Sequence, residues 1–274
     1  MTTQTPTPSV GELLRHWRQR RRLSQLALAA DADISQRHLS FLESGRASPS
    51  REMLLRLAEQ LAIPLRERNR LFLAAGLAPA YGERALDTPE LATVRRVVDQ
   101  LLDAHAPYPA LAVDRHWSLV AANRPLGLLL EGVDPALLEP PVNVLRLSLH
   151  PRGLASRILN FREWRAHILE RLARQSESMP DGSLADLADE LRSFPVPIGA
   201  RPHHPTSRAQ YAGIAVPLEL ALPDGSVLTL LSTTTVFGTP LDVTLEELAI
   251  ESFFPADEAT REIMQRLAAD EQVR

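Results

Sequence analysis

The segment from Leu23 to Ser50, which reads LSQLALAADADISQRHLSFLESGRASPS, constrains the fold of this chain more than any other. A helix-turn-helix consists of two short helices that cross steeply through a tight turn, with a small residue where they touch. Ser24 and Ser35 can cap the amino ends of two such helices, and Ala29 supplies the small contact. Asp33 occupies the turn, where aspartate tolerates a left-handed backbone better than most residues. The segment therefore predicts a helix-turn-helix.

The same region extends into a small helical domain. Val10 to Arg21 has apolar residues at helical spacing, Ser50 can cap a fourth helix, and a fifth can end at Gly76. Gly45 follows the second helix of the motif, where a left-handed residue commonly ends a helix. The sequence thus predicts an all-α domain of five helices over residues 9–76.

Charge is distributed unevenly along the chain. All 30 basic residues are arginine and no cysteine is present, which excludes disulfides, thiol catalysis, cysteine-ligated metals and lysine-dependent chemistry. Residues 1–76 carry 12 arginines against 7 acidic residues, a net charge of +5, whereas residues 77–274 carry 18 against 27, a net charge of −9. A basic small module joined to an acidic larger one is typical of a nucleic-acid-binding domain attached to a domain with another task.

The second helix of the motif carries the side chains that we expect to read DNA. The apolar residues of this helix face inward, so most residues between 36 and 41 face outward. Glutamine and arginine can bond bidentately to adenine or guanine edges in the major groove. Flanking arginines and the amide of a glutamine at the start of the preceding helix can contact phosphates. The predicted DNA-binding residues are Arg18, Arg22, Gln25, Ser35, Gln36, Arg37, His38, Ser40, Phe41 and Arg46.

Beyond residue 76 the sequence changes character. Residues 77–89 contain several helix breakers and no periodicity, so we expect a linker there. The remainder, residues 90–270, reads as a second domain. Its expected amphipathic helices cover residues 90–103, 160–176, 183–193 and 256–269, and another begins after residue 123.

Two hairpins are predicted within this second domain. One pairs the apolar runs 110–114 and 117–121, and the other pairs 214–222 with 227–235 around a Pro-Asp-Gly turn. Helices combined with antiparallel hairpins indicate an α+β domain with an antiparallel sheet. The fold class of the whole chain is therefore predicted to be α+β.

Aromatic residues make up only 5% of the chain, so their positions in the second domain are informative. They can line an apolar ligand pocket or form ordinary core, and the sequence leaves both readings open. Arg162 and Arg165 flank one of them, and either can pair with a ligand carboxylate or form a surface salt bridge. The candidate ligand-binding residues are Trp117, Phe161, Trp164, Phe237 and Phe253.

No catalytic, metal or membrane signal accompanies these patterns. The motifs G-x-S-x-G, H-E-x-x-H and G-x-x-x-x-G-K are absent from the sequence. The adjacent pair His203-His204 lies in a proline-rich setting that favours a solvated loop over a metal site. Residues 1–9 lack the apolar core of a signal peptide, and no window approaches the ~18 apolar residues of a membrane span. We therefore expect a cytoplasmic protein that is not an enzyme, with no catalytic residue and no metal.

The motifs carry two resemblances. Ser24-Gln25, Leu28-Ala29, Leu42 to Arg46 and the downstream PSREMLLRLAEQL resemble the XRE-type helix-turn-helix of phage repressors, over about residues 9–76. The runs YPALAVDRHWSLVAAN, LNFREW and TPLDVTLEELAIESFFPAD resemble MmyB-type transcriptional regulators over most of residues 90–270. The second resemblance implies a bacterial regulator with a PAS-like sensory domain, whose pocket holds a fatty acid or a similar apolar small molecule.

Together the motifs and the resemblances predict a sequence-specific, DNA-binding transcriptional regulator that senses a small apolar ligand. We expect it to bind double-stranded DNA as a homodimer, on a palindromic operator whose half-sites lie about one helical turn (~34 Å) apart. Apart from a fatty acid or similar apolar molecule, no cofactor is expected. Two alternatives stay open: an antitoxin or protein-interaction module whose XRE head binds a protein partner, and a small-molecule enzyme that carries an inherited DNA head.

Overall fold

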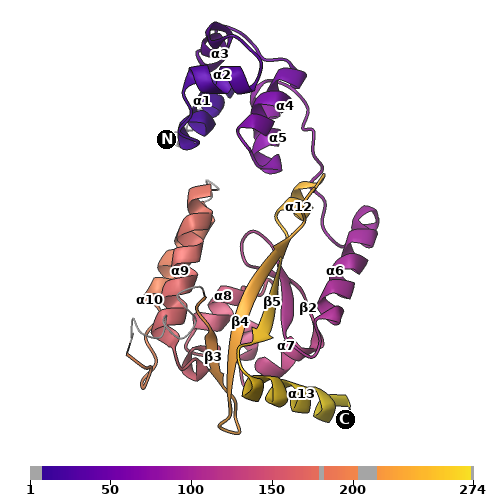
Figure 1. Ribbon diagram of the computed structural model, residues 1–274, viewed down its shortest axis with the longest axis vertical. Helices are drawn as coiled ribbons and strands as arrows, with labels where there is room; N and C mark the ends of the chain where they lie inside the picture. Colours follow the sequence, from indigo (N-terminus) through magenta and orange to yellow (C-terminus); the bar gives the residue numbers. More distant parts are fainter. Residues whose placement is uncertain (1–7, 179–181, 203–214, 273–274) are drawn as a thin grey trace. The chain divides into compact units, whose positions relative to one another are not determined.

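The computed structural model describes residues 8–178, 182–202 and 215–272, and its chain forms two compact units (Figure 1). The first unit comprises the residues up to Ala85 together with Gly238–Glu246. The second comprises Leu86–Phe237 and the residues from Glu247 onward. A short segment between two strands of the second unit therefore belongs to the first unit.

Five helices build most of the first unit, as the sequence predicts. The predicted caps are present, because Ser24, Ser35 and Ser50 each accept a hydrogen bond from the backbone N–H three residues later. Asp33, with φ 52°, and Gly45, with φ 73°, supply the left-handed turns that follow the two helices of the motif. The helices are α1 (Val10–Arg20), α2 (Gln25–Asp31), α3 (Gln36–Glu43), α4 (Arg51–Gln60) and α5 (Leu65–Ala74).

The core of this unit is tightly packed where α1 meets α3. A Cβ added at Gly11 would lie 2.5 Å from the backbone oxygen of Leu42, so only glycine allows this approach. Trp17 of α1 and Leu39 of α3 lie in the same buried cluster, together with Phe72 of α5. Close packing of these helices holds the outward face of α3 in a fixed orientation.

Residues 77–85, expected to form part of the linker, pack on the first unit. The side-chain oxygen of Asn69 accepts hydrogen bonds of 3.0 Å from the backbone N–H groups of Ala80 and Tyr81. The ring of Tyr81 also packs against the helical core. This segment is thus anchored by hydrogen bonds to α5 that sequence periodicity does not reveal.

The returning segment adds a short helix, α12 (Val243–Glu246), to the first unit. The carboxylate of Glu246 accepts a hydrogen bond of 2.7 Å from the backbone N–H of Leu65, the first residue of α5. Asp242 forms an ion pair of 3.1 Å with Arg84. Both contacts join residues more than 150 positions apart in the sequence.

The second unit is an α+β fold built on a five-stranded sheet with the order β2-β1-β5-β4-β3, in which every neighbouring pair is antiparallel. This confirms the predicted fold class. The strands are β1 (Ala110–Val113), β2 (Leu119–Ala122), β3 (Leu218–Ala221), β4 (Val227–Val236) and β5 (Ala249–Pro255). The helices are α6 (Ala92–Ala104), α7 (Arg124–Leu129), α8 (Val144–Leu149), α9 (Phe161–Ser178), α10 (Gly182–Ser193) and α13 (Glu258–Gln272). Short 3-10 turns lie at Pro89–Leu91, Pro135–Leu137 and Ala155–Arg157.

The two faces of the sheet serve two separate cores. Leu111 of β1 faces the large core, which it shares with side chains of α7, α8, α9 and α10. Ala110 and Ala112 face the other side, where they pack with Val98 and Leu102 of α6. Side chains alternate between the two faces of a strand, so β1 reads as a continuous apolar run although it serves two cores. Figure 1 shows α6 on one side of the sheet and α8 and α9 on the other.

Strand β5 is missing from the predicted hairpins, and this is the main correction to the sequence analysis. It lies between β1 and β4 and joins the two predicted hairpins into one sheet. The pair of β1 and β2 and the pair of β3 and β4 confirm those hairpins. Residue 214 and the pair His203-His204 lie outside the described residues. Within the described ranges, no helix combines the length and the apolar character needed to cross a membrane.

Candidate functional site

The outward face of α3 forms the first candidate site. Gln36 and Arg37 are exposed at its amino end. The guanidinium groups of Arg37 and Arg46 lie 5.3 and 5.8 Å from the centre of the Phe41 ring. The surface thus presents the half-buried ring of Phe41 with the guanidinium groups of Arg37 and Arg46 near it. His38 and Ser40 are half-buried on the same helix.

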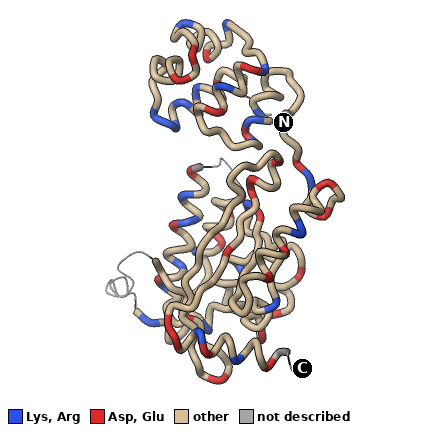
Figure 2. Tube along the Cα trace, turned by 45° about the vertical axis from the view of Figure 1, so that its right-hand side comes forward, with Lys and Arg blue, Asp and Glu red and all other residues tan. Residues whose placement is uncertain are grey.

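Three arginines of this unit stay available to an anion. Arg22, Arg37 and Arg46 are exposed and take part in no ion pair within the described ranges. Figure 2 lets the reader follow the basic positions along the trace of the unit. Unpaired arginines are the side chains that neutralise phosphates on a nucleic acid.

A buried carboxylate holds α3 against the helices behind it. The side chain of Glu43 is fully buried and accepts hydrogen bonds from two nitrogens of Arg18, at 2.6 and 2.9 Å, and from the amide of Gln25, at 2.8 Å. Burial alone would raise the pKa of Glu43, but these hydrogen bonds and the charges of Arg18 and Arg15 outweigh it, so the pKa lies below its usual value. Glu43 therefore ties α1 and α2 to α3.

Two predicted DNA-binding residues belong to this network. Arg18 and Gln25 were expected at phosphates, but the structure directs their polar ends to Glu43, and Arg18 also donates to the backbone oxygen of Leu23 at 2.9 Å. Ser35 caps α3, and Arg22 lies at the exposed turn between α1 and α2. The outward group on α3 and just after it consists of Gln36, Arg37, His38, Ser40, Phe41 and Arg46.

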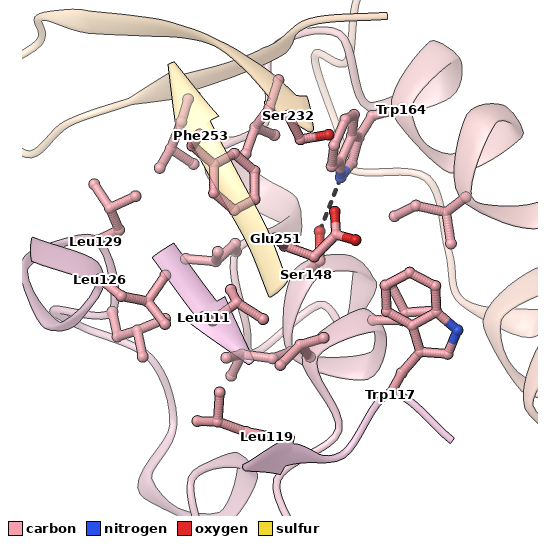
Figure 3. Close-up of a pocket in the computed structure, with 18 of the residues that line it drawn as sticks. Leu111, Trp117, Leu119, Leu126, Leu129, Ser148, Trp164, Ser232, Glu251 and Phe253 are labelled. Carbon is pink, nitrogen blue, oxygen red and sulfur yellow. Dashed lines mark hydrogen bonds between the residues drawn. The ribbon is translucent and has the colours of Figure 1, made fainter. Parts of the chain in front are cut away.

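The second candidate site is a partly open cavity of about 90 Å³ inside the second unit (Figure 3). Its wall combines the inner face of the sheet with side chains of α7, α8 and α9. Most of the lining is aliphatic, which suits an apolar guest. The aliphatic lining residues are Leu111, Leu119, Leu126, Leu129, Leu130, Val144, Leu145, Leu147, Leu154, Ile168, Leu218 and Leu220.

Polar groups of the cavity gather on one part of its wall. The indole N–H of Trp164 donates a hydrogen bond of 3.0 Å to the hydroxyl of Ser148. In Figure 3, Trp164 and Glu251 lie on one side of the cavity, with Leu126 and Leu129 on the opposite side. A guest would thus meet an aliphatic wall and a polar wall.

An arginine–glutamate pair forms part of the polar wall. Arg171 of α9 donates to both carboxylate oxygens of Glu251 on β5, at 2.5 and 3.0 Å. The hydroxyl of Thr234 accepts from Arg171 at 2.6 Å and donates to Glu251 at 2.8 Å. The guanidinium also lies 4.5 Å from the centre of a Trp117 ring, within cation–π range. The pair therefore joins α9 to the centre of the sheet.

Trp117 reaches the cavity from a strained turn between β1 and β2. Its φ of 66° is in the left-handed region, which costs a bulky residue about 1–3 kcal/mol. A carboxylate oxygen of Asp114 stabilises the turn by accepting from the backbone N–H groups of His116 and Ser118, both at 2.8 Å. The indole N–H of Trp117 donates to Gln175 at 2.9 Å. Strain of this kind is commonly found at ligand sites.

His167 also lines the cavity, and it lies on α9 between Trp164 and Arg171. Burial lowers the pKa of this imidazole, and the nearby positive charges of Arg171 and Arg174 lower it further against the smaller opposing effects of Glu170 and Glu251. The ring lies 5.6 Å from that of Trp164. His167 is therefore neutral near pH 7.

The structure brings together three of the five aromatic residues proposed for the pocket. Trp117, Trp164 and Phe253 line the cavity. Phe161 is fully buried in the same core but away from the cavity, and Phe237 packs in the other core, beside α6. Arg162 is exposed and Arg165 donates to the backbone oxygen of Phe194, so neither arginine lines the cavity.

The polar residues of the cavity wall were not predicted from the sequence. Trp164, His167 and Arg171 recur at intervals of three and four, so they share one face of α9, and this signal was readable. Glu251 and Phe253 are two residues apart on β5 and face the same side, but β5 was not predicted. The described residues include no cluster of histidine, aspartate and glutamate that could hold a metal ion.

Comparisons with known proteins match two family models to this chain. The family model described as the MmyB-like transcription regulator ligand binding domain matches residues 94–267, and a helix-turn-helix model matches residues 14–68. Both are regulatory families rather than enzymatic ones. No curated protein matches this chain. A solved structure described as an RNA-binding light-oxygen-voltage receptor is 11% identical, with a TM-score of 0.27, and the match covers 97% of this chain and 64% of that one.

Proposed function

The chain belongs to the family of MmyB-like transcription regulators, and we propose that α3 reads a specific DNA sequence while the cavity of the second unit binds a small apolar ligand. It is a DNA-binding transcription regulator with a ligand-binding domain. A regulator that binds DNA works where the chromosome is, so we place it in the cytoplasm of a bacterial cell.

The observation that carries the DNA part is the exposed cation pair around Phe41. Arg37 lies in the first turn of α3, where the recognition helix of a helix-turn-helix contacts base edges. Gln36 precedes it and can bond bidentately to adenine, as arginine can to guanine. Arg22 and Arg46 are then the phosphate contacts, whereas Arg18 and Gln25 act through Glu43 by holding α3 in place.

We propose that two copies bind a palindromic operator. Helix-turn-helix proteins gain affinity and register when two heads occupy half-sites about one helical turn (~34 Å) apart. A single α3 contacts only a few base pairs, so one head supplies too little discrimination against the many competing sites of a genome. The homodimer follows from this need for a second half-site.

The lining of the cavity supports the proposal of an aliphatic ligand, such as an acyl chain. Its lining offers 12 aliphatic residues and three aromatic ones. The enclosed space of about 90 Å³ is below the ~150 Å³ of a cavity that accepts benzene, so a long chain would extend through the opening or displace side chains. This size favours a ligand that inserts one end.

The strands that line the cavity provide a route to the DNA-binding unit. Ser232, Glu251 and Phe253 lie on β4 and β5, and the chain between these strands includes Gly238–Glu246, which belongs to the first unit. A ligand alters DNA binding only if it binds one arrangement of the protein more tightly than another. We propose that movement of β4 and β5 around the ligand is the origin of that difference.

The DNA part is tested with operators selected from a random duplex library. Arg37→Ala should weaken binding to the selected operator by about 1–3 kcal/mol and relax the base preference at one position of each half-site. Fluorescence anisotropy with a panel of single-base operator variants measures both effects.

Arg22→Ala is the matched control. Loss of a phosphate contact should weaken all sequences by a similar factor and reduce the slope of log affinity against log salt by about 1. If Arg37→Ala behaved in the same uniform way, the assignment of Arg37 to base reading would be wrong.

A further inference from the structure

The polar wall of the cavity already contains its own counter-ion pair. Arg171 donates to both carboxylate oxygens of Glu251, and Thr234 bridges the two side chains. The side chain of Glu251 is only 5% exposed, whereas that of Arg171 is 27% exposed. Arg171, the side chain that could pair with an acidic ligand, is thus already paired with Glu251.

The wall as a whole is electrically balanced. Arg171 and Glu251 carry opposite charges, and His167 is neutral near pH 7 because burial and neighbouring arginines lower its pKa. No other charged side chain lies among the residues that line the cavity within the described ranges. The cavity therefore offers no net positive charge to a guest.

A guest with an ionised carboxylate meets two obstacles in such a site. It would have to compete with Glu251 for Arg171, and it would lie beside a second, nearly buried negative charge. Like charges at short range in a site lined mainly by aliphatic side chains repel strongly, and the anion would also lose part of its own hydration. Both effects act against an acid and leave an uncharged molecule of the same shape unaffected.

Uncharged hydrogen-bonding groups complete the polar wall. The Ser148 hydroxyl accepts from Trp164 and keeps its own proton to donate. The Ser232 hydroxyl and the His167 ring have no hydrogen-bond partner among the described residues, so they can both donate to a guest and accept from it. These groups suit an alcohol, an ester or an amide.

We infer that the cavity selects an aliphatic ligand whose polar end is uncharged, such as an alcohol, ester or amide, and discriminates against the ionised carboxylate of a free fatty acid. This inference rests on the proposed function of the cavity as a ligand site. The pair of Arg171 and Glu251 determines the specificity, because Glu251 already neutralises the one arginine of the cavity wall.

The test compares two probes that differ in charge and hardly in shape, octanamide and octanoate. Each is titrated into the full-length protein at pH 8, where octanoate is ionised, and quenching of the Trp117 and Trp164 fluorescence measures occupancy. We expect octanamide to bind at least about tenfold more tightly than octanoate. Octanoate binding as tightly as octanamide would overturn the inference and leave the ligand site in place.

Glu251→Gln gives the selectivity a sharper test. The variant keeps the shape of the side chain and releases Arg171 from its counter-ion, so octanoate should gain by more than its deficit in the unchanged protein and overtake octanamide. The matched control is Glu190→Gln, which removes the acid of another bidentate pair in the same unit, Arg146–Glu190, at 2.6 and 2.7 Å. That pair does not line the cavity, so the preference for octanamide should not change.

A blocking variant separates failure of the inference from failure of the proposed ligand site. Leu126→Trp fills the cavity and should abolish binding of both probes. If neither probe binds to the unchanged protein, or if Leu126→Trp leaves their binding intact, the assignment of the cavity as the ligand site is wrong and the inference falls with it. The ratio measured on the unchanged protein needs no variant to fold, and thermal melting verifies that Glu251→Gln is folded.

Discussion

Each unit of the molecule contains an arginine–glutamate pair with a nearly or fully buried carboxylate, and the two pairs differ in what lies beside them. In the first unit, Glu43 is fully buried, and Arg18 also bonds to the backbone oxygen of Leu23. In the second unit, Arg171 and Glu251 line a cavity. The same chemistry is sealed into a helical core in one case and presented to a guest in the other. A buried ion pair is therefore informative about function only when the space next to it is known.

The largest effect should come from removing the arginine of each pair. Arg18→Met leaves the buried carboxylate of Glu43 with the amide of Gln25 and the more distant guanidinium of Arg15, at 3.6 Å, which should cost the first unit about 3–5 kcal/mol of unfolding free energy. Arg171→Met leaves Glu251 beside a cavity that water can enter, so the loss in the second unit should be smaller, about 1–3 kcal/mol. Hydrogen exchange resolved by mass spectrometry measures each unit separately in the full chain.

Double variants check the cause of these losses. Replacing both members of the sealed pair, in Arg18→Met with Glu43→Leu, should recover most of the lost stability, because no buried carboxylate remains and Arg15 is exposed to water. Equal losses in the two single variants would contradict the comparison, since they would mean that the cavity gives Glu251 no more solvation than Glu43 receives in the helical core.

The two units also differ in how much of them the sequence predicts. The five helices of the first unit follow from local signals, namely the serine caps and left-handed residues such as Gly45 and Gly76, both with φ 73°. The sheet of the second unit depends on pairing between distant segments. Strand β5 escapes prediction because a charged residue, Glu251, lies in its centre, and its partner Arg171 is 80 positions away.

The candidate sites repeat this difference. The outward residues of α3 are readable because a helix of known register has a known outer face. Aromatic composition identifies Trp117, Trp164 and Phe253 but gives no reason to separate them from Phe161 and Phe237. That separation depends on which side of the sheet and which turn of α9 each residue occupies, and packing decides this only in three dimensions.

Lowering the pH should destabilise the two units in different ranges. The folded-state pKa of His167 is depressed below 6.5, so between that folded value and 6.5 the unfolded chain binds more protons, and the second unit loses stability as pH falls below 6.5. The pKa of Glu43 is depressed below 4.5, so its contribution to the first unit is present above 4.5 and is lost only as pH falls further.

Urea unfolding at pH 8, 6.5 and 5 measures this difference. In a Trp17→Phe background, the fluorescence of Trp117 and Trp164 reports the second unit alone, and its midpoint should fall between pH 6.5 and 5. His167→Gln should flatten that dependence, because the glutamine cannot take up a proton. A midpoint that falls equally in the His167→Gln variant would assign the effect to other groups.

The smallest predicted effect concerns the segment through which the second unit's strands reach the first. Pro64 precedes α5 and offers no side-chain cap, so the N–H of Leu65 depends on the carboxylate of Glu246. Glu246→Ala should lower the stability of the first unit by about 1 kcal/mol, as loss of a helix cap does. Glu246→Gln keeps an acceptor oxygen and loses only the charge at the positive end of the helix, so its cost should be about half as large.

Hydrogen exchange at the amide of Leu65 and along α5 measures both variants. If the carboxylate serves only as a local cap, protection should fall in α5 while the strands β4 and β5 keep theirs. Reduced protection in these strands as well would show that anchoring Gly238–Glu246 also stabilises the strands that line the cavity. The pair of Arg18 and Glu43 and the pair of Arg171 and Glu251 would then differ in one more respect. Only the second would lie in a site whose shape depends on the other unit.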